Sequence, residues 1–141
     1  MSAKFFLDTN IFVYTFDSSA PAKADIATGL VHAALQSHQG AISYQVVQEF
    51  FNVALRRFAE PMNATDAGQY LNTVFRPLLR IHSSPALFVE ALDIQMKHGL
   101  SWYDSLIVAA ALEAGCTRLL SEDMQHGRAF GALRIENPFL S

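Results

Sequence analysis

Short apolar runs alternate along the chain with longer segments whose apolar residues recur at helical spacing. The short runs have the length and the flanking turn residues of buried strands, and they cover residues 5–7, 41–43, 78–82, 117–121 and 132–136. The longer segments carry helix start residues, such as Ser84 and Pro85, and helix stop residues, such as Gly40 and Gly99. They cover residues 21–40, 44–58, 64–75, 84–99 and 101–115. This alternation predicts a three-layer α/β/α fold around a central parallel sheet of four to five strands.

Length and composition indicate the class of protein. The chain has 141 residues, a length typical of one domain, so we expect residues 1–141 to form a single domain. Only 16% of the residues are charged, against about 25% in typical globular domains, so the positions of the charges are informative. Cys116 is the only cysteine, which excludes an intrachain disulfide and favours a cytoplasmic protein. Asp8 and Asn10 interrupt the N-terminal apolar stretch, so neither a secretory signal nor a membrane span is expected.

The formal net charge of −3 argues at first against a nucleic-acid partner. Net charge misleads, however, when acidic residues are gathered at one metal site. If four of the 13 acidic residues held a divalent metal, the other nine would face ten basic residues. Charge therefore neither supports nor excludes nucleic acid, and the positions of the acidic residues have to decide.

In parallel α/β sheets the functional crevice lies at the carboxyl ends of the strands, so acidic residues that follow the predicted strands are the candidates. Asp8 directly follows the first strand, where it suits a turn or a helix cap as well as a metal site. Glu49 lies on a polar stripe of its helix, which is also typical of a solvated face. Asn52 and Val53 stand three and four residues after Glu49, so an ion pair along the helix does not account for it.

Asp104 and Asp123 complete the set of candidates. Asp104 shares the face of its helix with Ile107, so its side chain is expected to point toward protein or a cleft. Ser101 and Asp104 also resemble a capping box, and a role as a cap is compatible with a role as a metal ligand. Asp123 follows the fourth predicted strand, with Glu122 as a competitor for the same role, and both residues also suit a turn.

Four carboxylates at one edge of a sheet repel one another unless protons or cations relieve the repulsion. Oxygen ligands without a Cys or His cluster favour Mg²⁺ or Mn²⁺ over zinc. Such a centre suits phosphodiester cleavage, because the metal lowers the pKa of a bound water and neutralises charge that develops on the phosphate. The chain has no G-x-x-x-x-G-K-[S/T] or G-x-G-x-x-G stretch, which argues against a nucleotide-dependent enzyme.

Four stretches, FFLDTNIFVY, VQEF, WYDSLIVAAALEAG and LLSEDMQHG, resemble in this order and spacing the PIN domain family, in particular the compact bacterial members typified by VapC toxins. The resemblance spans essentially the whole chain and implies an α/β/α fold with Mg²⁺- or Mn²⁺-dependent ribonuclease activity. It places the acidic centre of the family at four positions, namely Asp8, Glu49, Asp104 and Asp123. It further implies supporting hydrogen bonds from Thr9 and Ser121, a homodimer, and inhibition by a small antitoxin protein.

The leading hypothesis is a metal-dependent endoribonuclease, the toxin of a VapBC-type toxin–antitoxin pair, which cleaves RNA by attack of a metal-activated water on the phosphate. Asp8, Asp104 and Asp123 would hold the metal, and Glu49 would position a water or accept its proton. The alternative is a catalytically weak or inactive PIN-fold module that binds nucleic acid. A phosphohydrolase of the haloacid dehalogenase type is disfavoured, because it needs a second Asp where Asn10 stands.

Three residues near the acidic candidates are possible contacts for RNA. Arg56 follows Glu49 by seven residues on the same stripe, where it suits either an RNA phosphate or plain exposure to solvent. Trp102 and Tyr103 precede Asp104 directly. Aromatic rings in such a place stack on unpaired bases, but they also commonly pack in cores or dimer interfaces.

Overall fold

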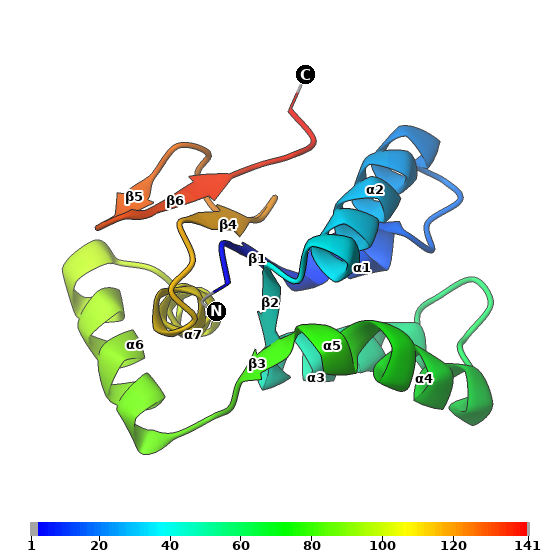
Figure 1. Cartoon of the computed structure of the whole chain (residues 1–141), viewed down its shortest axis with the longest axis horizontal. Helices are drawn as coiled ribbons and strands as arrows, with labels where there is room; N and C mark the ends of the chain where they lie inside the picture. Colours follow the sequence, from blue (N-terminus) through cyan, green and yellow to red (C-terminus); the bar gives the residue numbers. More distant parts are fainter. Residues whose placement is uncertain (1–2, 141) are drawn as a thin grey trace.

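A six-stranded sheet forms the centre of the structure, a computed structural model that describes residues 3–140 (Figure 1). The strand order is β3-β2-β1-β4-β6-β5, and all neighbours are parallel except β5 and β6. The strands are β1 (Phe5–Leu7), β2 (Gly40–Ser43), β3 (Leu79–Ile81), β4 (Arg118–Leu120), β5 (Ala129–Phe130) and β6 (Leu133–Glu136). All five predicted strands are present, and β5 adds a sixth that the sequence did not predict.

Helices cover both faces of the sheet, with α6 and α7 on one side and α1 to α5 on the other (Figure 1). The helical elements are α1 (Thr9–Tyr14), α2 (Pro21–Ser37), α3 (Tyr44–Ala54), α4 (Ala64–Tyr70), the π-helical turn η1 (Leu71–Phe75), α5 (Arg76–Leu78), α6 (Pro85–His98) and α7 (Trp102–Glu113). The predicted three-layer α/β/α architecture is therefore confirmed. Within residues 3–140, no helix is both long enough and apolar enough to cross a membrane.

The core is built from the strands, from a cluster of phenylalanines and from α7. Phe12, Phe50 and Phe75 are fully buried, and the Phe75 ring meets the rings of Phe12 and Phe50 edge-on, with 5.1 Å between centroids in each pair. Every residue of α7 from 105 to 111 is buried. This burial explains why α7 carries so few charges, and it anchors the helix directly after Asp104, which lies in the first turn.

The helix start signals act as the sequence predicts. The hydroxyl of Ser84 accepts a hydrogen bond from the backbone N–H of Leu87 at 3.1 Å, and Ser101 does the same for Asp104 at 3.1 Å. Gly99 ends α6 with a φ of 69°, a left-handed conformation in which glycine carries no steric penalty. These caps set where α6 and α7 begin and end, and thereby the position of Asp104 relative to the sheet.

The prediction that Gly40 ends the helix at 21–40 is wrong. The left-handed residue after α2 is His38, with a φ of 58°. Gly40 lies within β2, and a Cβ atom added to it would stand 2.5 Å from the Cβ of Ala34. Gly40 is therefore needed because α2 packs directly against the start of β2.

Two predicted helices differ in their course from the prediction, and one helix was not predicted. The helix predicted at 44–58 ends at Ala54, whose carbonyl accepts a hydrogen bond from the backbone N–H of Met62 at 2.9 Å as the chain turns back. The helix predicted at 64–75 changes at Leu71 into a π-helical turn, whose Leu71 carbonyl accepts from the N–H of Arg76. The helix α1 was not predicted at all, and it begins directly after Asp8.

Candidate active site

Asp8 lies at the carboxyl end of β1 and is held from three sides. Its backbone N–H donates to the carbonyl of Leu120 at 3.0 Å, which extends the pairing of β1 with β4. Its Oδ1 accepts from the backbone N–H of Thr9 at 2.7 Å, so Asp8 caps α1, and its Oδ2 accepts from the Ser121 hydroxyl at 2.8 Å. Only 5% of Asp8 is exposed. Asp8 is therefore both a helix cap and a buried carboxylate at the expected edge of the sheet.

Glu49 reaches the same edge because α3 starts immediately after β2, the neighbour of β1 in the sheet. Its Oε1 accepts a hydrogen bond of 2.6 Å from the hydroxyl of Thr9, and its Oε2 lies 3.5 Å from Nε2 of Gln45, one turn earlier. Thr9 thus contacts Asp8 through its backbone and Glu49 through its side chain. The position of Thr9 agrees with the supporting role that the resemblance assigned to it.

Asp123 is oriented by two polar residues. The hydroxyl of Ser121 accepts from the backbone N–H of Asp123 at 3.2 Å while donating to Asp8. Nδ2 of Asn10 lies 3.0 and 2.9 Å from the two carboxylate oxygens of Asp123. The sequence analysis gave Asn10 no role in the site and missed this contact. The available signal was its place two residues after Asp8, beyond the carboxyl end of a predicted strand.

Asp104 completes the group from the first turn of α7. The four carboxylates line one cleft of about 270 Å³, which we call the carboxylate cleft. Its lining residues are Asp8, Thr9, Asn10, Gln45, Glu49, Asn52, Val53, Asp104, Ile107 and Asp123. The face that Asp104 was expected to share with Ile107 is therefore the one that meets the cleft, and no lysine or arginine is found among these described lining residues.

Glu122, the competitor of Asp123, lies outside this lining. Its Oε1 accepts a 2.6 Å hydrogen bond from the hydroxyl of Tyr14, and its Oε2 forms a 2.8 Å ion pair with Lys23 of α2. Arg56 does not line the cleft either. Because α3 ends at Ala54, Arg56 lies exposed in the following turn and not on a continuous helical stripe with Glu49. Its contact with RNA stays a prediction.

Burial dominates the titration of Asp8. Loss of hydration raises the pKa of its carboxyl from 3.8 to about 7, against the hydrogen bonds from Ser121 and Thr9, which lower it. The negative charges of Asp123 and Glu49 raise this pKa further. Asp8 therefore carries a proton over much of the acidic range unless a cation replaces that proton.

Asp123 shows the same direction for the same reasons. Partial burial and then the charges of Asp104, Glu122 and Glu49 raise the pKa of Asp123, while the hydrogen bond from Asn10 lowers it. Neighbouring negative charges thus raise the cost of ionising both Asp8 and Asp123. The cleft concentrates negative charge that the lining side chains do not neutralise, which is the electrostatic condition that favours a bound cation.

The donor chemistry of the cleft fits Mg²⁺ or Mn²⁺, because all its charged donors are carboxylate oxygens. Within residues 3–140, however, no three His, Cys, Asp or Glu side chains are already arranged as a metal-binding group. Three of the four carboxylates use their oxygens in hydrogen bonds, Asp8 with Ser121 and Thr9, Glu49 with Thr9, and Asp123 with Asn10. Metal binding would therefore exchange some of these hydrogen bonds for coordination.

The fold and the site define an α/β/α protein with a carboxylate-lined cleft at the ends of its parallel strands. A comparison with sequence-family models gives the family. The model of the PIN domain matches residues 5–129, so the chain belongs to the PIN domain family. No curated protein sequence matches the chain.

Solved structures of toxin–antitoxin proteins share this fold. A chain of a toxin–antitoxin complex from Klebsiella pneumoniae is 18% identical, with a TM-score of 0.65 and 98% of each chain covered. A chain of VapBC2 from Rickettsia felis, bound to promoter DNA, is 17% identical, with a TM-score of 0.66, 94% of this chain and 96% of that chain covered. VapC20 from Mycobacterium tuberculosis, described as a toxin that cleaves the sarcin–ricin loop, is 19% identical, with a TM-score of 0.60, 85% and 90% covered. At these identities the likeness establishes the fold.

Proposed function

We propose that this protein is a Mg²⁺- or Mn²⁺-dependent endoribonuclease and the toxin of a VapBC-type pair. The observation that carries the proposal is the carboxylate cleft, where four acids gather at the strand ends without a basic residue in the lining. Membership of the PIN domain family and the fold shared with toxin–antitoxin proteins support it. The description of one such protein as a toxin that cleaves the sarcin–ricin loop supports RNA as the substrate.

The positions of the side chains in the carboxylate cleft support the following roles. Asp8, Asp104 and Asp123 would hold the cation, which would supply positive charge to lower the pKa of water and to stabilise charge on the phosphate. Glu49 lies on the α3 side of the cleft, where it would orient the attacking water and accept its proton. Thr9 keeps one oxygen of Glu49 in place through its 2.6 Å hydrogen bond.

Ser121 and Asn10 would hold the metal-binding carboxylates in position. The hydroxyl of Ser121 contacts both Asp8 and the backbone of Asp123, so it links the segments that follow β1 and β4. Asn10 would hold Asp123 in the metal-free protein and release it when the cation binds. These residues would therefore act on metal affinity more than on the chemical step.

The test is cleavage of structured RNA with Mg²⁺ or Mn²⁺ by the wild type and by the variants Asp8→Asn and Asp104→Asn. Each variant should lose at least about a hundredfold in rate, because a metal ligand contributes several kcal/mol to transition-state stabilisation. Asp25→Asn, an exposed residue of α2, is the matched control and should cleave like the wild type. Equal activity in the wild type and in both site variants, or full activity in EDTA, would contradict the proposal.

A second pair of variants separates the two adjacent acids after β4. Asp123→Asn should reduce activity, whereas Glu122→Gln should leave it nearly unchanged, because Glu122 is engaged by Tyr14 and Lys23. A larger loss from Glu122→Gln than from Asp123→Asn would reverse the assignment. RNA cleavage rates with saturating Mn²⁺ are the measurement.

We also propose an antitoxin partner, a homodimer and a cytoplasmic location. The toxin–antitoxin complexes that share the fold support the partner, and the other two rest on the sequence. The partner is tested by co-purification of this chain with the product of an adjacent short reading frame, and the dimer by sedimentation velocity. Absence of a stable complex with any adjacent product would contradict the toxin role while leaving the nuclease assignment intact.

A further inference from the structure

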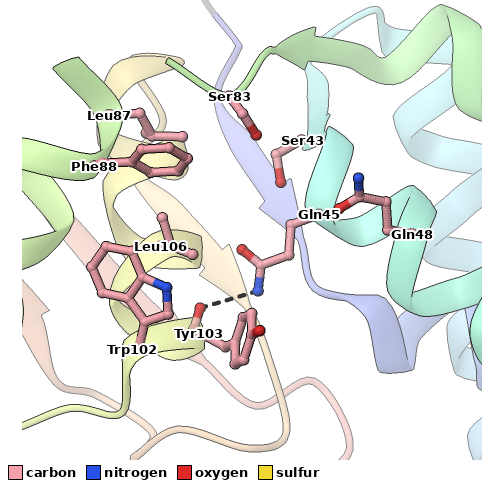
Figure 2. A pocket seen from close by; sticks show the side chains of 9 residues that line it. All are labelled: Ser43, Gln45, Gln48, Ser83, Leu87, Phe88, Trp102, Tyr103 and Leu106. Atoms are coloured by element: carbon pink, nitrogen blue, oxygen red, sulfur yellow. Dashed lines mark hydrogen bonds between the residues drawn. The ribbon is translucent and has the colours of Figure 1, made fainter. Parts of the chain in front are cut away.

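A second cleft lies beside the carboxylate cleft. It has a volume of about 400 Å³, which is in the range of about 300–1,000 Å³ typical of small-molecule sites. It lies between the start of α3 on one side and α6 with α7 on the other (Figure 2). We call it the aromatic cleft and describe it by its two walls.

The wall formed by α6 and α7 is aromatic and partly exposed. Phe88 of α6 and Trp102 of α7 have ring centroids 6.1 Å apart and ring planes inclined by 48°. Phe88 is 41% exposed and Tyr103 is 63% exposed. Figure 2 shows these three rings beside one another along the wall. Exposed aromatic faces of this kind are the surfaces on which unpaired bases stack.

The opposite wall is polar and uncharged. Gln45 and Gln48 come from α3, Ser43 ends β2, and Ser83 precedes α6 (Figure 2). Glutamine and serine side chains donate and accept hydrogen bonds, as the edges of bases require. None of the nine described lining residues carries a charge, so the cleft favours a neutral flat ring over a phosphate or a charged peptide side chain.

Ser43 provides an independent sign that a polar ligand belongs in this cleft. Only 4% of Ser43 is exposed, and its Oγ has no hydrogen-bond partner within the described part of the chain. Although Ser43 stands at the N-cap position of α3, its side chain makes no capping hydrogen bond. Figure 2 shows its oxygen turned toward the space between the walls. Buried hydroxyls are rarely left unpaired, so a small movement that opens this oxygen to the cleft would let a base edge satisfy it.

Gln45 connects the two clefts. It lines both of them, and its Nε2 donates to the backbone carbonyl of Tyr103 at 3.1 Å while lying 3.5 Å from Oε2 of Glu49. Gln48 and Tyr103, which line the aromatic cleft, directly precede Glu49 and Asp104 of the carboxylate cleft. A nucleotide with its base in the aromatic cleft would therefore present its own phosphate to the carboxylates.

We propose that the aromatic cleft binds one unpaired nucleobase of the RNA substrate, next to the phosphodiester that the carboxylate cleft receives. This inference rests on the proposed function, because it names a feature of the substrate of the same site. It explains how an RNA would be selected at a loop or single strand, where bases are free to leave the stack. It assigns Phe88, Trp102 and Tyr103 to stacking, and the glutamines and serines to the base edge.

Binding is measured through Trp102, the only tryptophan of the chain, whose fluorescence should fall when a base stacks on its ring. The probe is a single-stranded RNA oligonucleotide of mixed sequence, with Ca²⁺ in place of Mg²⁺ to neutralise the carboxylates without rapid cleavage. The control is an abasic oligonucleotide with the same number of phosphates. The expected result is quenching by the RNA and little or none by the abasic chain.

Two variants probe the stacking wall without disturbing the carboxylate cleft. Phe88→Ala and Tyr103→Ala should each weaken RNA binding and lower the cleavage rate by about tenfold, the effect typical of losing one stacked base. Both side chains are exposed, so the variants should fold, and circular dichroism checks this. Val89→Ala, an exposed apolar neighbour on α6 that does not line the cleft, is the matched control and should behave like the wild type.

The outcomes separate the two proposals. If the wild type cleaves RNA and the Phe88 and Tyr103 variants cleave equally well, the nuclease assignment stands and the base site is overturned. If no RNA is cleaved but base-dependent quenching is observed, the base site stands and the nuclease assignment fails. Equal binding of abasic and normal RNA overturns the base site. Weaker self-association of both Phe88→Ala and Val89→Ala, with unchanged RNA binding per dimer, would instead assign this face to a second copy of the chain.

Discussion

Replacing Asp8 by Asn should stabilise the metal-free protein at neutral and alkaline pH. In the folded protein, burial raises the pKa of the Asp8 carboxyl from 3.8 to about 7, whereas the unfolded chain restores the ordinary value. Between these values the folded state binds one more proton than the unfolded state, so its stability falls as the pH rises. Below about pH 4 the carboxyl is protonated in both states and this cost disappears.

The magnitude follows from the size of the shift. About three pKa units at about 1.36 kcal/mol each give a cost of about 4 kcal/mol for holding the ionised Asp8 in place at pH 8. Asn removes the charge and keeps the geometry, because its amide oxygen can still accept from the N–H of Thr9 and cap α1. The hydroxyl of Ser121 can turn to accept from the new amide. The free energy of unfolding of the variant should therefore exceed that of the wild type by up to about 4 kcal/mol at pH 8.

The assay is urea unfolding of both proteins in EDTA, followed by circular dichroism at several pH values from 4 to 8.5. The difference between variant and wild type should grow from near zero at pH 4 to its full value above pH 7. Asp25→Asn, which changes an exposed carboxylate, should show no such growth. Two results would refute the assignment of Asp8 as a buried acid without a positively charged partner. One is a difference in stability that does not depend on pH, and the other is a wild type that is the more stable protein at pH 8 without metal.

A related variant tests the cause of the shift. Ser121→Ala removes a hydrogen bond that lowers the pKa of Asp8, so this pKa should rise further. The penalty should still begin near pH 4, where the unfolded chain ionises, but in the Ser121→Ala protein it should grow larger and level off at a higher pH than in the wild type. An unchanged profile would mean that Ser121 does not stabilise the ionised form.

Two further substitutions act on the frame of the site. Thr9→Val keeps the shape of a buried side chain but removes the hydroxyl that donates to Glu49 at 2.6 Å. It should lower the free energy of unfolding by about 1–3 kcal/mol and reduce the rate of RNA cleavage more than tenfold. Cleavage at the wild-type rate by Thr9→Val would exclude a positioning role for Thr9. Gly40→Ala places a Cβ atom 2.5 Å from the Cβ of Ala34 and should lower the free energy of unfolding in urea by about 1–3 kcal/mol. The melting temperature provides a check. An unchanged stability would show that α2 can shift away from β2 at little cost.

Much of the frame was predictable because its signals are local. The five predicted strands and the caps at Ser84 and Ser101 depend on residues within a few positions of one another, and all are present. The helix α1 was missed because Thr9–Tyr14 is only six residues long and is rich in β-branched and aromatic residues, which favour strands. Its start depends on Asp8 as a cap, and that role was only one of the interpretations open for Asp8.

The meeting of the four carboxylates was predictable from topology, since parallel strands end at one edge. The choice between Glu122 and Asp123 was not, because the turn after β4 sends the two side chains in different directions, one toward Lys23 of α2 and the other toward Asn10. Such partners lie about a hundred residues away in the sequence, and only the folded chain reveals them. The aromatic cleft is likewise a product of three segments that no local pattern connects.

The neighbouring positions of β1 and β4 in the sheet have a consequence for the synthesis of the protein. Asp8 is held by Ser121, a residue 113 positions later, and its backbone pairs with Leu120. Contacts between such distant residues form late, because a long loop has to close first. A growing chain therefore has an N-terminal Asp8 without its partners until nearly the whole sequence has left the ribosome. Any activity that depends on the complete cleft would therefore appear only after Leu120 and Ser121 have been made and have folded against β1.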